Sequence, residues 1–285
     1  MKLNIFKCGI ALVAVTCVHA QQTVSVPGTA NIFGAGHSTP PAPGGGSGGT
    51  LPPSFSLTPN PGQVLTIVSV TGAAGLTSWI GSFGADGNQS LAWPTSISSF
   101  DGISGITNSS GSGFLTGVFL GPDEPVDPAP PNLDFSMSEI GTSFLTLSPQ
   151  IAQTFFIGDG LTGTGTGSQQ QFIVPTNATR LYLGLADANS YQGQPGQYQD
   201  NIGVWSVTFQ ISTAAPLLVS GSFTNGNFQL QVTSTTNTSF GLQASPDLVT
   251  WTNIVSGFTD TNGILFLQDT NAVSFPRRFY RAVSQ

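Results

Sequence analysis

The chain has little charge, and most of the charge that it has is negative. Only 7% of its 285 residues are charged. Both lysines, Lys2 and Lys7, lie at the N-terminus, so the chain beyond residue 20 carries four arginines against all 13 acidic residues, a net charge of −9. Such a chain repels phosphate backbones and anionic lipid surfaces. We therefore expect no nucleic-acid or membrane partner, whereas a cation is compatible with this charge.

Cysteine and histidine are also scarce. Cys8 and Cys17 both lie in the first 20 residues, and beyond residue 20 the chain has one histidine, His37. This scarcity argues against a disulfide, Ser-His-Asp or Cys-His catalysis, and thiolate or multi-histidine zinc sites. Paired carboxylates for glycoside hydrolysis remain an alternative, but no spacing singles out an acid and its partner. We expect a protein that is not an enzyme.

Long apolar runs are missing, since no stretch reaches the roughly 20 apolar residues of a membrane span. Residues 1–20 combine two lysines, a short apolar run and the sequence Val18-His19-Ala20, which is typical of a signal peptide cleaved before Gln21. A lipoprotein signal ending at Cys17 is the alternative, although Thr16 fits it poorly. We expect a protein that is secreted or held at the cell surface, without membrane insertion once the signal is removed.

Helical periodicity is hard to find, and alternating apolar and polar residues bounded by Gly, Pro and Asn recur instead. Residues 64–70 and 180–185 follow this pattern. A third run places four apolar residues on one face: Trp205, Val207, Phe209 and Ile211. Half-buried strands of this kind predict an all-β chain built from β-sandwiches.

Composition divides the chain near residues 213–216, where Thr-Ala-Ala-Pro interrupts the strand pattern. We expect a jelly-roll-like or galactose-binding-like β-sandwich over 21–212, a linker at 213–216, and a second small β-sandwich over 217–285 of fibronectin type III-like character. Within the first domain, residues 37–53 are rich in Pro and Gly, which predicts a flexible loop.

Three short glycine-containing segments predict turns. Asn225-Gly226 and Asn262-Gly263 are hairpin signals in the second domain. Residues 158–168, GDGLTGTGTGS, look superficially like a phosphate-binding loop, but they lack its lysine and precede a strand rather than a helix. We expect an inter-strand turn there.

Oxygen-bearing side chains gather between two predicted strands. Asp187 ends one strand, Tyr191 lies in the following loop, and Tyr198-Gln199-Asp200-Asn201 precedes the next strand. An extracellular calcium site needs carboxylates, amide oxygens and backbone carbonyls converging from a turn. Asp and Asn beside Gly are also ordinary turn residues, so this pattern alone leaves both readings open.

The segments LYLGLAD and YQDNIGVWSVTF, within residues 181–209, are similar to the end of the calcium-dependent bacterial galactose-binding lectins of the PA-I type. NPGQVLTIVSVTGA, over 60–73, resembles a strand of the same family, and the similarity extends over roughly 23–211. The loop is longer here than in that family. The histidine and glutamine with which the family holds galactose have no clear match in 84–93.

This resemblance implies a calcium site and a sugar site that share residues. Asp187, Asp200 and Asn201 match calcium ligands, and Gln197 falls where the family supplies a backbone carbonyl. The resemblance further implies that calcium bridges the protein and two vicinal hydroxyls of a sugar, with Asp187 and Asp200 near that sugar. Tyr191 and Tyr198, with Trp79 and Trp93, are candidates for sugar stacking, although aromatic residues more often fill cores.

The C-terminal sequence SPDLVTWTNI…FPRRFYRAV resembles a small sandwich domain found at the ends of secreted proteins from Verrucomicrobia-like bacteria. Its arginines, Arg277, Arg278 and Arg281, predict either a docking surface or a solvated strand edge. From the whole sequence we expect a secreted, calcium-dependent carbohydrate-binding protein that recognises galactose-like or other glycans. The alternative is a non-catalytic extracellular structural or adhesion protein with a degenerate lectin-like domain.

Overall fold

The computed structural model describes residues 21–284 except 61, 78–80, 91–93, 214–216 and 235–236. The predicted signal peptide, Trp79, Trp93 and most of the predicted linker lie outside these residues. Within the described part, strands are joined by loops and a few 3-10 turns, which confirms the all-β prediction. No helix in that part is long and apolar enough to cross a membrane.

The chain divides into two compact units: the first contains residues 21–59 and 64–211, and the second contains residues 212–284 together with the short segment around Asn60–Gln63. The largest sheet of the first unit has the order β1-β16-β3-β13-β9, with β4 beside β3. Its strands are β1 (Gln22–Pro27), β3 (Gln63–Thr77), β4 (Gly81–Phe83), β9 (Thr146–Leu147), β13 (Gln171–Ile173) and β16 (Ile202–Thr213).

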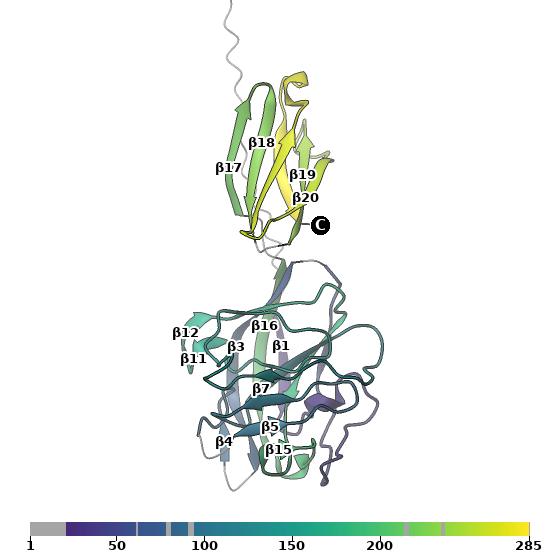
Figure 1. The fold of residues 1–285 in the computed structure, drawn as a ribbon, viewed down its shortest axis with the longest axis vertical. Helices are drawn as coiled ribbons and strands as arrows, with labels where there is room; N and C mark the ends of the chain where they lie inside the picture. The colour runs from purple at the N-terminus through teal and green to yellow at the C-terminus, as the bar shows by residue number, and fades with distance from the viewer. Residues whose placement is uncertain are drawn as a thin grey trace, which may run out of the picture. The chain divides into compact units, whose positions relative to one another are not determined.

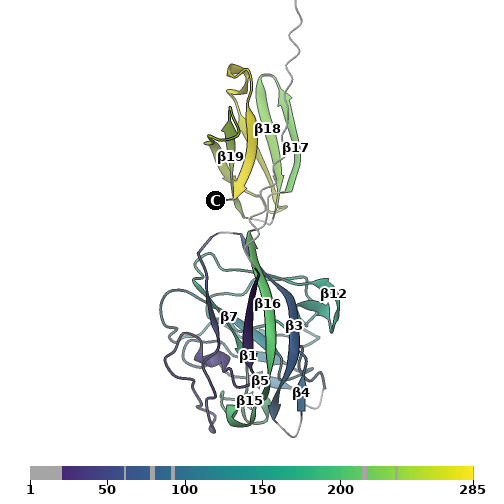
Figure 2. The same ribbon diagram turned by 180° about the vertical axis from the view of Figure 1, so that it is seen from behind.

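A second sheet of this unit has the order β10-β7-β14-β2 and a third the order β15-β5-β6-β8. Their strands are β2 (Ser54–Ser56), β5 (Thr95–Ile97), β6 (Ile106–Asn108), β7 (Leu115–Leu120), β8 (Leu133–Asp134), β10 (Phe155–Phe156), β14 (Arg180–Leu185) and β15 (Gln192–Gly193). Seen from opposite sides, β7 and β5 lie in front of β16 and β3 in Figure 1 and behind them in Figure 2, so these sheets form facing layers.

Buried and more exposed side chains alternate along β16, and this alternation shows which face of the largest sheet is buried. Trp205 and Val207 are fully buried, whereas Val204 is 47% exposed. Phenylalanines then join the layers, because the ring of Phe155 on β10 stacks on Phe119 of β7 (5.1 Å between centroids) and packs against Phe172 of β13 (5.3 Å). Burial of these large apolar rings supplies most of the stabilisation of this unit.

The second unit is a small sandwich of two three-stranded sheets, β17-β18-β21 and β20-β19-β22. Its core includes the buried Phe240 and Leu242, and the ring of Phe228 stacks on Tyr280. Its elements are β17 (Leu217–Thr224), β18 (Asn227–Thr233), β19 (Ser239–Ser245), β20 (Thr252–Phe258), β21 (Ile264–Asp269), the 3-10 turn η4 (Ala272–Ser274) and β22 (Phe279–Ser284).

The two Asn-Gly signals have different outcomes. Asn225-Gly226 closes the β17–β18 hairpin with both residues at positive φ (51° and 82°), as predicted. The hairpin prediction for Asn262-Gly263 is wrong, because this turn connects β20 in one sheet to β21 in the other. The Asp260 carboxylate fixes it by accepting hydrogen bonds from the Asn262 and Ile264 amides (2.8 and 2.9 Å).

Residues 158–168 include a separate two-stranded ribbon of β11 (Leu161–Gly163) and β12 (Thr166–Gln169). The Asp159 carboxylate accepts hydrogen bonds from the amides of Leu161 and Gly165 and so fixes the entry to this ribbon. The segment is therefore a β-ribbon of its own between β10 and β13, rather than the simple inter-strand turn that the sequence predicts.

Substituting neighbouring valines of β16 tests which of its faces is buried. Val207→Ala removes two fully buried methyl groups, so we expect it to lower the free energy of unfolding by about 2 kcal/mol. Val204→Ala removes the same groups from the exposed face and should change it by less than about 0.5 kcal/mol. Denaturant titration of the two variants measures both values, and equal losses would contradict the assignment of faces.

Candidate functional site

The predicted ligand residues lie in the loop 186–201, which connects β14 of one sheet to β16 of the other. Two 3-10 turns shape this loop, η2 (Asn189–Tyr191) and η3 (Tyr198–Asp200). The fully buried Tyr198 holds the two ends of the loop together. Its hydroxyl accepts a hydrogen bond from the Asp187 amide (3.0 Å) and donates one to the Leu185 carbonyl (2.8 Å).

Asp187 is only 2% exposed. Burial is the main reason that the pKa of its carboxyl group is raised to about 8, and the charge of Asp200 raises it further. Hydrogen bonds from the Ala188 amide and the Asn201 side chain act in the opposite direction and lower the pKa. The Asp187 side chain is therefore a carboxyl group with too few partners to hold a full negative charge on its own.

Asp200 and Asn201, at the end of the same loop, each have an unpaired side-chain oxygen. The Asn201 side chain is buried, and its Nδ2 donates to the Gly28 carbonyl (2.9 Å), which fixes the orientation of the amide. Within the described chain, neither Oδ1 of Asn201 nor Oδ1 of Asp200 has a hydrogen-bond partner, although both atoms are buried. Such buried, unpaired acceptors are costly unless a donor or a cation meets them.

Tyr191 and Tyr198 have little surface to offer to a sugar. Tyr198 is fully buried, and Tyr191 is 6% exposed. The pKa of Tyr191 is raised to about 12, first by burial and then by the charges of Asp187 and Asp200. The tyrosines support the site from within, because their rings fill the base of the loop rather than its surface.

Gln197 lies at the N-cap of η3 in the left-handed conformation (φ 71°). Its side chain points away from the carboxylates, because its Oε1 accepts a hydrogen bond from Gln199 and its Nε2 faces the Gly44 carbonyl. Only its backbone carbonyl is therefore suited to the role that the sequence predicts.

The Gly/Pro segment 37–53 packs along this loop. Main-chain hydrogen bonds join Gly44 to Pro195, Gln197 to Gly45, and Tyr198 to Ser47, at 2.8 to 3.0 Å. The Gln199 side chain accepts a further hydrogen bond from the Ser47 amide. Glycine is needed for this approach, since a Cβ on Gly44 would lie 2.2 Å from the carbonyl oxygen of Gln194. Sequence analysis missed this contact because it joins segments about 150 residues apart.

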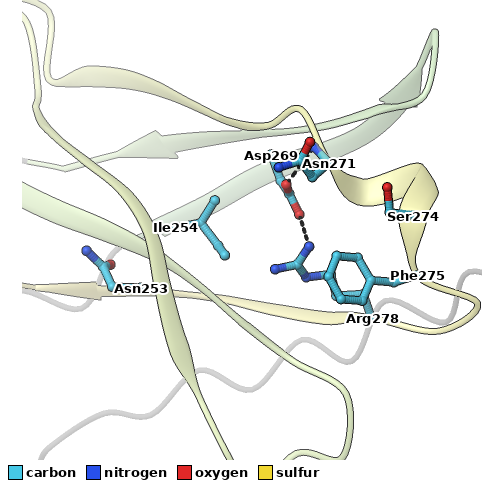
Figure 3. Close-up of a pocket in the computed structure, with 7 residues that line it drawn as sticks. All are labelled: Asn253, Ile254, Asp269, Asn271, Ser274, Phe275 and Arg278. Carbon is cyan, nitrogen blue, oxygen red and sulfur yellow. Dashed lines mark hydrogen bonds and ion pairs between the residues drawn. The ribbon is translucent and has the colours of Figure 1, made fainter.

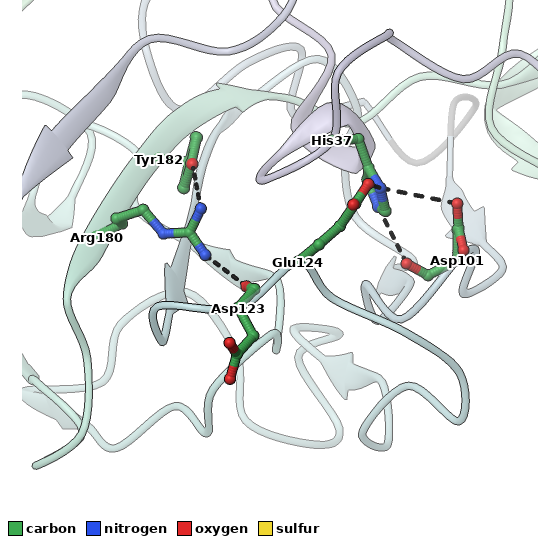
Figure 4. Close-up of polar contacts among 6 residues, drawn as sticks. All are labelled: His37, Asp101, Asp123, Glu124, Arg180 and Tyr182. Carbon is green, nitrogen blue, oxygen red and sulfur yellow. Dashed lines mark hydrogen bonds and ion pairs between the residues drawn. The ribbon is translucent and has the colours of Figure 1, made fainter.

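His37 lies elsewhere in the first unit, between two other loops (Figure 4). Its Nδ1 is 3.0 Å from the Glu124 carboxylate and 3.7 Å from that of Asp101, and its Nε2 is 3.1 Å from the Asp101 carbonyl. Both ring nitrogens are thus used to connect loops. Nearby, Arg180 donates to the carbonyls of Gly121 and Asp123 and to the Tyr182 hydroxyl.

The described residues contain no group of three or more His, Cys, Asp or Glu side chains placed to share a metal ion. A cation in the loop 186–201 would therefore need the Asn201 amide and backbone carbonyls beside its two carboxylates, a donor set that calcium accepts. No protein-family model, curated protein or solved structure matches this chain. The lectin resemblance and the site residues that it implies stay predictions.

The raised pKa of Asp187 predicts how stability depends on pH without a metal ion. Between about pH 4 and pH 8 the folded chain holds a proton that the unfolded chain has released, so stability should fall as the pH rises through this window. Asp187→Asn should remove the part of the slope that Asp187 contributes and exceed wild type by a few kcal/mol at pH 8, since one pKa unit corresponds to about 1.4 kcal/mol. A smaller slope should remain, because burial also raises the pKa of Asp86. Unfolding in EDTA at several pH values measures this.

Asp123→Asn is the control. Asp123 is exposed, so its substitution should leave the pH dependence of the free energy of unfolding as it is in wild type. A wild-type stability that does not change between pH 5 and pH 8 would contradict the buried state of Asp187.

Two glycine substitutions test the packing of the Gly/Pro segment. Gly44→Ala forces a Cβ against the Gln194 carbonyl, so we expect a loss of about 2 kcal/mol. The Cβ added by Gly84→Ala would have no other atom within 4 Å, and the φ of Gly84 is not positive. This substitution should therefore leave the free energy of unfolding unchanged or raise it by up to about 1 kcal/mol. Thermal unfolding compares them, and a neutral Gly44→Ala would show that the segment does not pack on the loop.

Proposed function

We propose that this is a secreted, non-catalytic protein that binds carbohydrate through a calcium ion held by Asp187, Asp200 and Asn201. The observation that carries the proposal is the group of buried oxygens in the loop 186–201, of which Asn201 Oδ1 and Asp200 Oδ1 have no hydrogen-bond partner in the described chain. The raised pKa of Asp187 supports it, because a divalent cation would stabilise the ionised carboxylate.

The chemistry of these donors suits calcium better than the other common metals. Calcium takes six to eight oxygen ligands, including carboxylates, amide and backbone carbonyls, and water. The loop supplies two carboxylates and one amide oxygen, and the Gln197 carbonyl is the proposed backbone ligand. Neither thiolate nor imidazole ligands, which zinc prefers, occur in this loop.

A sugar would occupy the remaining calcium positions with two neighbouring hydroxyl groups. Gln192 and Gln194 are exposed in the same loop, and their amides provide donors and acceptors for further hydroxyls. Because Tyr191, Tyr198 and Asp187 are buried, we assign sugar contact to the cation, the half-buried Asp200 and these exposed amides, and we assign Asp187 to holding the cation.

A structural or adhesion protein with a degenerate site is the second candidate. It is favoured by the hydrogen bonds that already fix the loop, since the Gly/Pro segment and Tyr198 hold its backbone without a ligand. The two candidates differ in one respect, which is whether the unpaired oxygens bind a cation.

Calcium titration followed by thermal unfolding separates these candidates. Extracellular modules bind calcium with dissociation constants of about 10⁻⁴–10⁻³ M. A concentration 100 times the dissociation constant should stabilise wild type by about 2.7 kcal/mol. Asp187→Ala should abolish both this gain and any calcium-dependent retention on immobilised galactosides, because both depend on the same ion.

Asp86→Asn is the matched control for this titration. Asp86 is also a buried aspartate with a raised pKa, but it lies outside the loop and accepts a hydrogen bond from the Asp159 amide. Its substitution should leave the calcium response intact. A wild-type unfolding midpoint that is equal in EDTA and in millimolar calcium would remove the lectin proposal and favour the structural protein.

A further inference from the structure

A cavity of about 510 Å³ lies in the second unit, between β20, the end of β21 and the segment that leads into β22. This volume is in the range of pockets that bind small molecules. Its lining residues, shown in Figure 3, are Asn253, Ile254, Asp269, Asn271, Ser274, Phe275 and Arg278.

A buried ion pair forms the base of the cavity. Nη1 of Arg278 is 2.9 Å from the Asp269 carboxylate, and the side chains are 13% and 2% exposed. Asp269 is further held by the Tyr280 hydroxyl (2.9 Å) and the Asn271 amide (3.0 Å). The pair therefore fixes the guanidinium while cancelling its charge.

An aromatic ring and several polar groups stand around this pair. The Phe275 ring is 3.8 Å from the centre of the guanidinium and is 41% exposed. Asn271 and Ser274 add an amide and a hydroxyl to the cavity lining. The Asn253 amide nitrogen donates to Ser256 and leaves its oxygen free.

We propose that this cavity is a second, metal-independent binding site for a neutral saccharide. A sugar ring presents apolar C–H groups on its face and hydroxyls at its edge. Phe275 and Ile254 can contact the apolar face of the sugar ring. The side chains of Asn253, Asn271 and Ser274 provide hydrogen-bond donors and acceptors for the hydroxyls at its edge. Because the Arg278–Asp269 pair has no net charge, the site offers an anionic ligand no net attraction. This site does not depend on the calcium loop of the first unit.

The test uses the full mature chain in EDTA, which removes any contribution from a calcium site. The probes are immobilised neutral oligosaccharides of galactose, glucose, mannose and xylose, with oligogalacturonate as the anionic comparison. We expect wild type to be retained by at least one neutral probe and not by oligogalacturonate. Phe275→Ala should weaken that binding about tenfold, and Asn253→Ala should weaken it by a smaller factor.

Phe266→Ala is the matched control, because Phe266 is an exposed phenylalanine of the same unit outside the cavity lining. It should bind as wild type does. Circular dichroism of each variant shows that the second unit is folded, and Asn253→Ala, on an exposed side chain, keeps the test valid if Phe275→Ala unfolds. The proposal is overturned if no neutral probe is retained in EDTA, if oligogalacturonate is preferred, or if both cavity variants bind like wild type. Calcium-dependent binding of wild type would be unaffected by these outcomes.

Discussion

The two ends of the loop 186–201 bury polar groups where water cannot satisfy them, although its middle residues are exposed. Tyr198 meets much of this constraint with one hydroxyl, which joins the Asp187 amide to the Leu185 carbonyl. The loop is thereby fixed with its carboxyl group facing inward, and the cost of that burial is visible in the raised pKa of Asp187.

The Gly/Pro segment contributes to the same constraint. Its glycines allow its backbone to approach the loop closely enough for main-chain hydrogen bonds, because a side chain at Gly44 would collide with the Gln194 carbonyl oxygen. A side chain at Gly48 would collide with the Pro40 carbonyl oxygen within the segment itself. Asn31 holds the segment from the other side, since its side-chain nitrogen donates to the carbonyls of Pro41 and Gly48. The low complexity of this stretch thus has a packing explanation.

Alternation and turn chemistry are local properties, which is why the sequence predicts the all-β fold, the buried face of β16 and the turn at Asn225-Gly226. The candidate ligands Asp187, Asp200 and Asn201 were also recognisable, because they are close in sequence. The buried role of Tyr198 and the Ser47–Gln199 contact depend on residues distant in the chain, and no periodicity encodes them. The Asn262-Gly263 turn shows the same limit, since its chemistry does not determine which sheets it joins.

The distribution of charge separates the two proposed sites. Between residues 21 and 211 the chain has ten acidic residues and one arginine, whereas residues 212–284 have three acidic residues and three arginines. The net negative charge of the first unit therefore favours cations over anions near its surface. In the second unit, Arg278 is paired with Asp269, and Arg281 lies over Trp251 and donates to Gln243. Because this unit has equal numbers of acidic residues and arginines, its net charge gives little reason to concentrate ions, and we expect recognition there to rely on shape, apolar contact and hydrogen bonds.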